Sequence, residues 1–535
     1  MPYPNYRFFS LCFILPVLFV FSACNPNPSK TKTVQKDSIA RKDVSIHGYF
    51  SNQQVLHTDT ASLKSFFIKH PLLKEYENEV SQFYIYRNFL FAWYNVNGLA
   101  EQASNLYIHL DNLEQEGIQV KIPYKENLDS LLNDPLTEQH AEMATEILLT
   151  AEYFFYADKV WNGISEKVTT KLEWLLPRKK LNLPYLTDSL LNEPSASLFT
   201  ENYNVLQYNL LKMQLKKYKQ LDSIGIWETL IPEKKSYIKN DSSDFIRTLR
   251  HRLFLLGDLA DDSVSKWFDD KLEAAVKSFQ DRNGMLPDGV AGPELLQEIN
   301  IPLKANIRKL IVNMERTRWI PKNLQKHYLI INIPFFTLAA YDNDTVTFKM
   351  NVVVGKALHK TVIFNGDIKY IVFSPYWNVT PSIMKNEILP AIRKNPNYLK
   401  KNNMEWNGNS IRQKPGPSNS LGLVKFLFPN SFNIYLHDSP AKSLFSAQSR
   451  AFSHGCIRLA EPKKLAEYLL KDDKAWNGEK INQAMHSGKE KYVTLSHPVP
   501  VYIGYMTAWV DKLGKLNFRK DIYNRDNPLE EMLIQ

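Results

Sequence analysis

The sequence predicts an α+β protein, with a mainly helical N-terminal half followed by a mainly β C-terminal part. Two stretches of the first half, 99–116 and 141–162, place apolar residues three and four positions apart, which is the period of a buried helix face. After residue 328 the pattern changes to short β-branched and aromatic runs such as 346–354 and 369–373, which turn residues separate. Because the chain has 535 residues, we expect about three folded domains.

The N-terminus has the pattern of an export signal. Arg7 precedes an apolar run over 8–20, which is shorter than the ~20 residues of a membrane-spanning helix, and Ser22-Ala23-Cys24 follows it. A cysteine directly after Ser-Ala resembles the lipobox of bacterial lipoproteins. We therefore expect a signal peptide over 1–23 and lipidation of Cys24, which would hold an exported protein in the cell envelope, facing the periplasm. The alternative is a plain signal peptide with an incidental cysteine.

The next segment, 24–44, is rich in Asn, Pro, Ser, Thr and Lys, a composition that cannot bury a core and predicts a flexible tether. The region over 45–243 that follows is expected to be helical, and we expect structural or surface roles for its isolated His residues. The formal net charge of +10 fits either a solvated surface or attraction to an anionic cell wall or membrane. No dense block of Lys and Arg supports a nucleic-acid partner.

The segment 244–302 predicts a compact unit of three short helices, and turn or loop residues separate one helix from the next. Phe279-Gln280, Gly284, Asp288-Gly289 and Gly292 follow one another at a spacing that resembles the three-helix peptidoglycan-binding module. The glycines mark tight turns in any such unit. Glycan binding and bracing of a neighbouring domain therefore remain equal alternatives.

The last segment, 303–535, is expected to form the mainly β domain, with strands that include 424–428 and 432–436. A helical insert that is rich in Lys and Asn interrupts the strand pattern at about 381–411. Such an insert could act as a lid that excludes water from a neighbouring site.

The cysteine count points to one reactive thiol. The chain contains Cys12, Cys24 and Cys456. On the expectation above, Cys12 would leave with the signal peptide and Cys24 would carry the lipid, so Cys456 would keep no partner for an intramolecular disulfide. A lone thiol in an exported protein is exposed to oxidation and calls for a functional explanation.

The residues around this thiol favour nucleophilic catalysis. A thiol attacks as the thiolate and needs a nearby base, for which His is the usual residue. His454 stands two positions before Cys456, and His437 lies further upstream. Gly455 would let an acyl oxygen reach main-chain N–H groups. The alternative is a small buried cysteine with two incidental histidines.

The string Ser453-His454-Gly455-Cys456-Ile457-Arg458, with His437 upstream, resembles the signature of the L,D-transpeptidases of the YkuD type. In papain-like cell-wall endopeptidases the cysteine comes before its histidine, whereas here it follows. The strings 374–379, 412–426 and 521–523 resemble the large multidomain subfamily of these enzymes, which has a helical scaffold domain, a peptidoglycan-binding module and a capping insert. The resemblance covers nearly all of the mature chain.

The resemblance implies a role for each residue of the site. Cys456 would be the nucleophile and His437 the general base and acid. His454 would orient the site, and the backbone N–H groups of Gly455 and Cys456 would form an oxyanion hole. Four further residues would contact substrate, although Arg458 could instead hold its loop and Trp377 could instead pack in a core: Tyr435, Arg458, Trp377 and Asn378. Thr361-Val362 and Ser374 depart from the family pattern at loops or strand ends.

The implied reaction releases D-Ala from a stem tetrapeptide, forms a thioester on Cys456 and passes the acyl group to an amine of a second stem. This 3→3 cross-linking belongs to peptidoglycan biosynthesis, cell wall biogenesis and the control of cell shape. The partners would be stem peptides, glycan and, through the lipid, a membrane, with no metal and no organic cofactor. Two alternatives remain, namely an L,D-carboxypeptidase that uses water at the same site and a non-catalytic peptidoglycan-binding lipoprotein.

Overall fold

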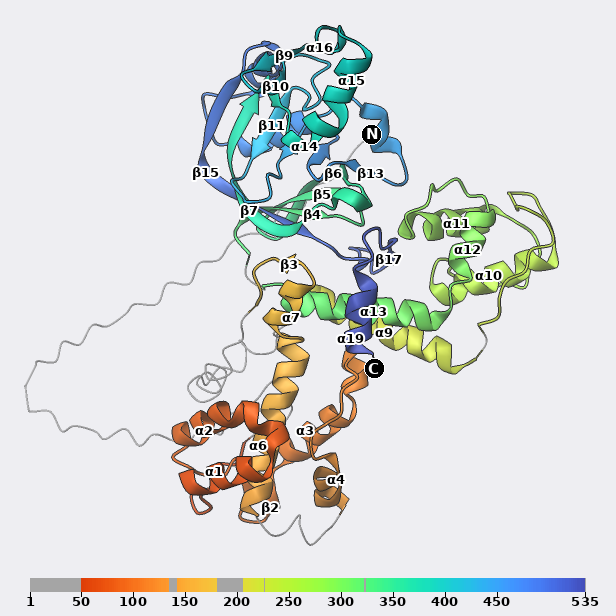
Figure 1. The fold of residues 1–535 in the computed structure, drawn as a ribbon. Coiled ribbons are helices and arrows are strands. Elements are labelled where there is room, and N and C mark those ends of the chain that lie inside the picture. The colour runs from red at the N-terminus through yellow and green to blue at the C-terminus, as the bar shows by residue number, and fades with distance from the viewer. Residues whose placement is uncertain (1–49, 134–141, 180–204, 226, 322–323, 535) are drawn as a thin grey trace, which may run out of the picture. The chain divides into compact units, whose positions relative to one another are not determined.

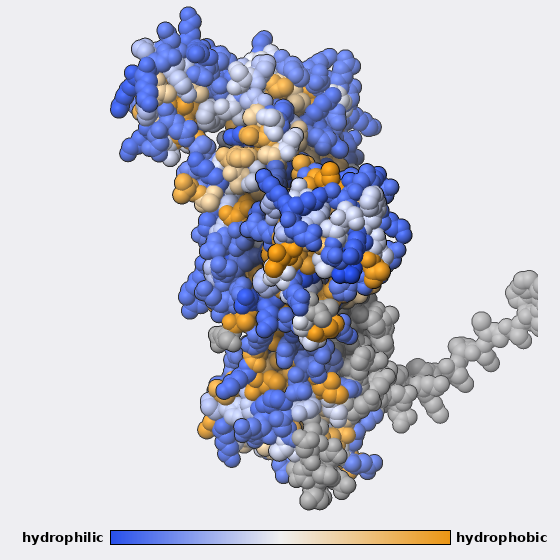
Figure 2. All heavy atoms as spheres, turned by 90° about the vertical axis from the view of Figure 1, so that its right-hand side faces the viewer, coloured by the Kyte–Doolittle hydropathy of each residue, from blue (hydrophilic) through white to orange (hydrophobic). Residues whose placement is uncertain are grey.

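The computed structural model describes residues 50–133, 142–179, 205–225, 227–321 and 324–534 (Figure 1). The expected signal peptide, tether and lipidated Cys24 lie outside the described residues. Helices dominate the first half of the described chain and strands dominate the second, so the α+β expectation is confirmed. Within this part, no helix combines the length and apolarity needed to cross a membrane. Hydrophilic residues cover most of the face in Figure 2, where hydrophobic residues form small separate groups.

The N-terminal helices are α1 (Thr60–Lys69), α2 (Glu77–Tyr86), α3 (Glu101–Asp111), α4 (Lys125–Asn133) and α6 (Met143–Ala157). Of these, α1, α2 and α3 contact the buried helix α6. The short hairpin of β1 (Tyr94–Asn95) and β2 (Gly98–Leu99) includes Leu99, so the helix that was expected from residue 99 begins at Glu101. Glu146 of α6 accepts hydrogen bonds from the backbone N–H groups of Ala92 (2.5 Å) and Trp93 (3.0 Å), which give this buried carboxyl group its partners. Burial raises the pKa of Glu146 to about 7.

The middle of the chain is helical, as expected. It contains α7 (Glu166–Lys171), the short strand β3 (Trp174–Leu175), α9 (Leu206–Ser223), α10 (Asp244–Leu256), α11 (Asp270–Arg282), α12 (Pro293–Ile299) and α13 (Leu303–Trp319). The side chains of Ser243 and Asp269 cap α10 and α11 by accepting backbone N–H groups of the first turn. Gly284, just after α11, has a φ of +72°, the left-handed geometry that ends a helix.

The C-terminal domain is built around one large sheet. Its order is β11-β12-β14-β6-β5-β4-β15-β7-β3, with β13 paired to β6. Because β11 pairs with β7 as well as with β12, the strands from β11 to β7 close into a ring. The bounds are β4 (His327–Asn332), β5 (Thr337–Asp342), β6 (Thr345–Gly355), β7 (Ile363–Phe373), β11 (Val424–Leu427), β12 (Leu436–His437), β13 (Ala451–Ser453), β14 (Ile457–Leu459) and β15 (Lys491–Gly504).

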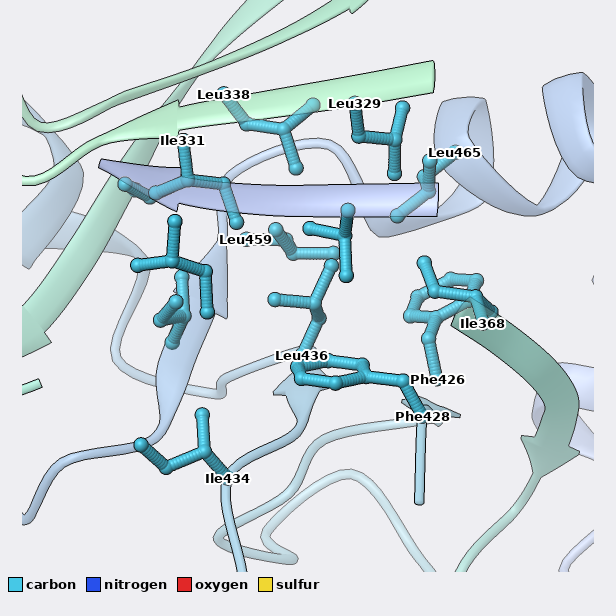
Figure 3. Close-up of a cluster of buried hydrophobic side chains, with 14 of the residues drawn as sticks. Leu329, Ile331, Leu338, Ile368, Phe426, Phe428, Ile434, Leu436, Leu459 and Leu465 are labelled. Atoms are coloured by element: carbon cyan, nitrogen blue, oxygen red, sulfur yellow. The ribbon is translucent and has the colours of Figure 1, made fainter. Parts of the chain in front are cut away.

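Apolar side chains from these strands meet in one core (Figure 3). Leu329, Leu338, Leu436 and Leu459 come from four different strands and are all fully buried. Leu465 of helix α17 (Pro462–Leu469) adds to the same cluster, and Met485 of α18 (Gly478–His486) belongs to it as well. This core fixes the strands that carry the candidate site.

The expected strand at 432–436 is shorter than predicted. Strand β12 comprises only Leu436 and His437. Asn433 has a φ of +55°, and the amide of Asn430 donates to the carbonyls of Phe428 (2.6 Å) and Ile434 (2.8 Å). These local side-chain bonds replace the ladder bonds of a longer strand.

The capping insert is helical only in its first part. It contains α14 (Pro381–Ile383), a π-helical turn (Met384–Ile388), α15 (Leu389–Lys394) and α16 (Tyr398–Lys401), and then the hairpin of β9 (Met404–Asn407) and β10 (Ser410–Gln413). β10 also pairs with β8 (Trp377–Asn378). Gly408 turns the hairpin at a φ of +60°, and Met404 and Ile411 join Val379 and Ile388 in a small separate core.

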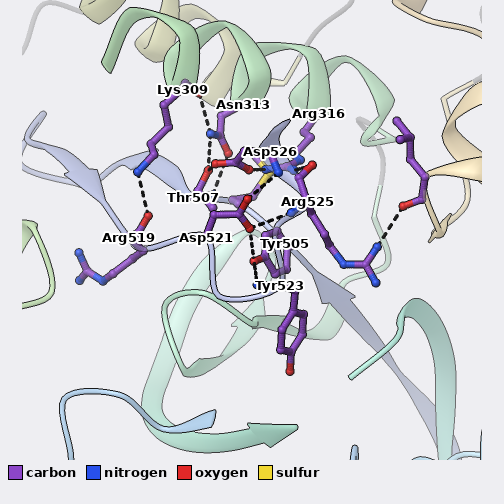
Figure 4. A network of polar contacts seen from close by, with 12 residues as sticks. Lys309, Asn313, Arg316, Tyr505, Thr507, Arg519, Asp521, Tyr523, Arg525 and Asp526 are labelled. Carbon is purple, nitrogen blue, oxygen red and sulfur yellow. Dashed lines mark hydrogen bonds and ion pairs between the residues drawn. The ribbon is translucent and has the colours of Figure 1, made fainter. Parts of the chain in front are cut away.

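The chain ends in the hairpin of β16 (Ala508–Val510) and β17 (Leu516–Phe518), followed by helix α19 (Asp526–Leu533). Buried polar contacts tie this segment to α13 (Figure 4). Asn313 donates to Thr507 Oγ1 (2.8 Å), and Arg316 pairs with Asp526 (2.6 Å).

Candidate active site

Strands β12 and β14 lie side by side in parallel, with Leu436 opposite Ile457 and His437 opposite Arg458. Leu436 and Ile457 are fully buried in the core. Side chains alternate along a strand, so the residues on either side of this pair project from the opposite face. That face carries four of the residues expected at the site: Tyr435, His437, Cys456 and Arg458.

A tight turn delivers the thiol to this face. Gly455 has a φ of +114°, a conformation that glycine adopts without strain. The Ser453 hydroxyl accepts the Gly455 N–H (3.1 Å) and donates to the Cys456 carbonyl (2.5 Å), so it closes the turn on itself. Cys456 is a free, partly exposed cysteine, with Sγ 3.6 Å from the carbonyl oxygen of Asn433.

The surroundings keep the Cys456 thiol protonated at rest. Burial raises the pKa of the thiol, whereas the backbone N–H and hydroxyl of Tyr435 and the charge of Arg458 lower it. Burial is the largest of these effects, so the pKa lies above its ordinary value. Attack therefore requires a base that removes the proton.

His437 has the state that such a base needs. Its ring is buried, and burial, together with the charge of Arg458, lowers its pKa to about 4. The imidazole is thus neutral near neutral pH. Nδ1 lies 2.5 Å from the Asp438 carbonyl oxygen. Because a carbonyl only accepts, Nδ1 carries the proton and Nε2 is the basic nitrogen.

Arg458 is a cation without a carboxylate partner among the described residues. Its guanidinium makes no ion pair in this part of the chain, and its buried Nε has no hydrogen-bond acceptor there. Burial lowers its pKa, which the nearby thiol partly offsets. The group is therefore available to an anion.

Lys425, which the sequence reading did not single out, joins the same row. It stands opposite His437 on β11, so it projects from the face that carries His437. It is buried, burial lowers its pKa, and its Nζ lies 3.9 Å from Glu490. A lysine inside the apolar run 424–428 is the signal that could have drawn attention to it.

His454 connects the nucleophile turn to the capping insert. Its Nε2 lies 2.9 Å from Glu387 Oε1, in the π-helical turn of the insert. The ring centroid of His359 is 5.2 Å from that of His454. The contacts of His454 thus fit a role in holding the turn and the insert together.

Of the two backbone donors expected in the oxyanion hole, the structure engages the N–H of Gly455 and leaves that of Cys456. The Gly455 N–H is engaged by Ser453 Oγ, as described above. No acceptor for the Cys456 N–H lies among the described contacts, which leaves this group for an acyl oxygen. The Gly455 carbonyl accepts the hydroxyl of Thr361 (2.9 Å), a contact across 94 residues that no local sequence pattern indicates.

Trp377 and Asn378 lie in the small sheet of the capping region. Trp377 packs against the core of the insert, and Asn378 is an exposed residue opposite Arg412. No described contact joins either of them to Cys456 or His437. In the described part of the chain, no group of three or more His, Cys, Asp and Glu side chains is arranged to hold a metal ion.

Models of three protein families match the chain. Residues 326–483 match the L,D-transpeptidase catalytic domain, 78–215 match the "Scaffold domain" and 242–299 match the "Putative peptidoglycan binding domain". The catalytic match contains both His437 and Cys456. The resemblance seen in the sequence is confirmed for these three segments.

A "Putative L,D-transpeptidase" of Haemophilus influenzae is 29% identical over 243 residues, which cover 42% of this chain and 49% of that protein. The match thus spans about half the length of this curated relative. An L,D-transpeptidase structure from Stackebrandtia nassauensis is 14% identical, with a TM-score of 0.23, and covers 51% of this chain and 97% of its own. An L,D-transpeptidase structure from Mycobacterium smegmatis is 14% identical, with a TM-score of 0.20, and covers 34% of this chain and 58% of its own.

Proposed function

We propose that this protein is an L,D-transpeptidase that forms 3→3 cross-links in peptidoglycan through a thioester on Cys456. One observation carries the proposal. Within the segment that matches the catalytic domain, adjacent strands place a thiol, a neutral buried imidazole and a cation on one face. This set can activate a nucleophile, return its proton and bind an anionic substrate.

Acylation begins when His437 Nε2 takes the proton of Cys456. The thiolate attacks the carbonyl between the third residue of the stem, an L-centre, and the fourth, D-Ala. The oxygen that becomes negative accepts the Cys456 N–H. His437 then gives its proton to the departing amine, so D-Ala leaves and the thioester remains.

Deacylation runs the same steps in reverse with a new amine. The side-chain amine of a diamino acid on a second stem attacks the thioester carbonyl and passes a proton to His437. The carbon–sulfur bond breaks, the new amide forms, and His437 returns the proton to Cys456. Proton and acyl group thus balance over the cycle without any further reactant.

Arg458 and Tyr435 support this cycle. Stem peptides carry free carboxylates, and the guanidinium of Arg458, which makes no ion pair with the described residues, lies beside the thiol and suits one of them. The phenol and backbone N–H of Tyr435 favour the thiolate. Both residues act on the charge that changes during attack.

The L,D-carboxypeptidase alternative shares the acylation step and differs only in the acceptor. The His454–Glu387 contact favours transfer, because it holds the capping insert beside the nucleophile turn, where an insert can exclude water. The non-catalytic alternative would leave the thiol, imidazole and cation without a use.

A protein with these domains acts outside the cytoplasm, because peptidoglycan lies there. We further propose that the lipid on Cys24 anchors it, on the strength of the apolar run 8–20 and the Ser-Ala-Cys string. Detergent-phase partitioning of the full chain beside a Cys24→Ala variant tests the anchor. Loss of partitioning in the variant supports it, and unchanged partitioning contradicts it.

The activity is tested by mass spectrometry of stem tetrapeptides incubated with the chain from residue 45 onward, beside a Cys456→Ala variant. If the protein is a transpeptidase, the wild type should release D-Ala and form 3→3 dimers, and the variant should do neither. D-Ala with only tripeptide would identify the carboxypeptidase. No Cys456-dependent change on several stem types would leave the non-catalytic alternative.

A further inference from the structure

A chain of buried hydrogen bonds connects the C-terminal segment to the nucleophile turn. We propose that Tyr523 is a positioning residue for acyl transfer, which acts through Thr361 on the peptide group that joins Gly455 to Cys456. This inference rests on the proposed function. Tyr523 lies beyond the segment 326–483 that matches the catalytic domain, so that match assigns it no role.

The first link joins the Tyr523 hydroxyl to two backbone groups. It donates to the Gly355 carbonyl (2.5 Å) and accepts the Thr361 N–H (3.2 Å). Tyr523 and Thr361 are buried. Burial raises the pKa of Tyr523, so the hydroxyl keeps the proton that it donates.

The second link joins the Thr361 hydroxyl to the nucleophile turn. It accepts the Gly355 N–H (2.9 Å) and donates to the Gly455 carbonyl (2.9 Å). The hydroxyls of Tyr523 and Thr361 thus hold the N–H and the carbonyl of Gly355 between them. A Cβ on Gly355 would lie 2.0 Å from the His359 carbonyl oxygen, so these groups pack without spare room.

The third link is the peptide group itself. The Gly455 carbonyl and the Cys456 N–H belong to one planar trans peptide, in which they point in opposite directions. Whatever holds the carbonyl therefore sets the direction of the N–H. Thr361 holds that carbonyl, and the Cys456 N–H is the donor that remains for the acyl oxygen.

Tyr523 is itself held on its other side (Figure 4). Its backbone N–H donates to the Tyr505 hydroxyl (2.9 Å), which donates to Asp521 (2.5 Å). Asp521 accepts the N–H of Asp526 (2.7 Å), and Asp526 pairs with Arg316 of α13 (2.6 Å). Tyr523 is thus fixed from α13 on one side, while its phenol holds Gly355 and Thr361 on the other.

Loss of the Tyr523 hydroxyl would leave the Gly355 carbonyl and the Thr361 N–H buried without this partner. The peptide between Gly455 and Cys456 would then be held less firmly. An oxyanion donor acts in the transition state, so its misalignment lowers kcat and leaves KM nearly unchanged. Removal of such a donor costs about 10²–10³ in rate, and for loosening we expect roughly tenfold.

The test compares Tyr523→Phe with Tyr468→Phe, which also removes a phenol that donates to a backbone carbonyl, that of Tyr341 (2.9 Å), away from the nucleophile turn. Two rates are measured on each folded protein, namely acylation of Cys456 by a stem tetrapeptide and alkylation of Cys456 by iodoacetamide. Alkylation needs the thiolate but no oxyanion donor. We expect slower acylation with unchanged KM and unchanged alkylation for Tyr523→Phe, and no change for Tyr468→Phe.

A second pair covers the case in which Tyr523→Phe does not fold. Thr361→Val removes the hydroxyl and Thr361→Ser keeps it, so the serine variant should acylate faster than the valine variant, with equal alkylation. Equal acylation by both, or by Tyr523→Phe and wild type, would overturn the inference. A p-nitrophenyl ester serves as a second acyl donor. If wild type reacts with this ester but not with stems, the proposed function fails while the positioning role is still measured.

Discussion

His437 and Arg458 stand opposite each other on the parallel strands β12 and β14, and both project from the face that carries Cys456. The charge of Arg458 lowers the pKa of His437 and also that of the thiol. Burial is the larger cause of the neutral base, and this one cation adds to it while it also favours the thiolate. The pH dependence of the reaction should therefore show the effect of Arg458 on both groups.

We predict that the acid limb of kcat/KM for D-Ala release lies near pH 4. The imidazole must be neutral to act as a base, and burial lowers the pKa of His437 from 6.5 to about 4. Activity is therefore present above this pH and lost as the pH falls through it. A limb near 6.5, in protein that circular dichroism shows to be folded, would contradict the assignment of His437.

The same pKa shift predicts a pH-dependent stability. Between the unfolded value of 6.5 and the folded value of about 4, the unfolded chain binds a proton that the folded chain excludes. His437 therefore lowers the free energy of unfolding as the pH falls through this window. Urea titrations across the window should show a smaller fall for His437→Gln than for wild type, and equal falls would count against a buried neutral ring.

Replacing Arg458 by Gln should move the acid limb upward and slow the alkylation of Cys456. Removal of the cation raises the pKa of His437 and that of the thiol, because Arg458 disfavours the imidazolium and favours the thiolate. The matched control is Arg412→Gln in the capping insert, where Arg412 pairs with Glu405. An unmoved limb in Arg458→Gln would show that the guanidinium does not act on His437.

Glu387→Gln should loosen the capping insert with little effect on global stability. The His454–Glu387 contact is 2.9 Å long but partly exposed, so its removal should cost at most about 1 kcal/mol. Hydrogen exchange of residues 381–401 measures this, with Glu479→Gln as control, since the exposed Glu479 accepts a bond from Gln483 within its own helix, α18. Equal exchange in both variants would mean that the contact does not hold the insert.

Leu436→Ala should lower the free energy of unfolding by about 2–5 kcal/mol, because it leaves a cavity in the core beside His437. Leu513→Ala, at a site that is 82% exposed, should cost almost nothing. Chemical denaturation of both variants gives the comparison. A cost below about 1 kcal/mol for Leu436→Ala would be inconsistent with its packing.

The sequence predicted the fold class and four of the residues on the site face, Tyr435, His437, Cys456 and Arg458, because their signals are local. Helical periodicity, β-branched runs and the string 453–458 can each be read within a few residues. The sequence could not predict that Thr361 reaches the nucleophile turn or that Tyr523 holds Thr361, since these hydrogen bonds join residues 94 and 162 positions apart. The sequence also could not predict that β3, at Trp174–Leu175, pairs with Ile363–Phe364, because a two-residue strand has no periodicity.

The shorter β12 and the β9–β10 hairpin show the same limit at closer range. Hydrogen bonds from the amide of Asn430 override the β-branched pattern before Leu436. In the capping insert the polar residues after 401 gave no alternation strong enough to predict strands, and the hairpin depends on packing of Met404 and Ile411 against the helices.

Acyl transfer through Cys456 is tested most directly by the intact mass of the protein after brief incubation with a stem tetrapeptide, followed by peptide mapping. We predict one adduct with the mass of the tripeptide acyl group, located on Cys456 and absent from Cys456→Ala. Release of D-Ala without an adduct on Cys456, or an adduct that persists in Cys456→Ala, would contradict it.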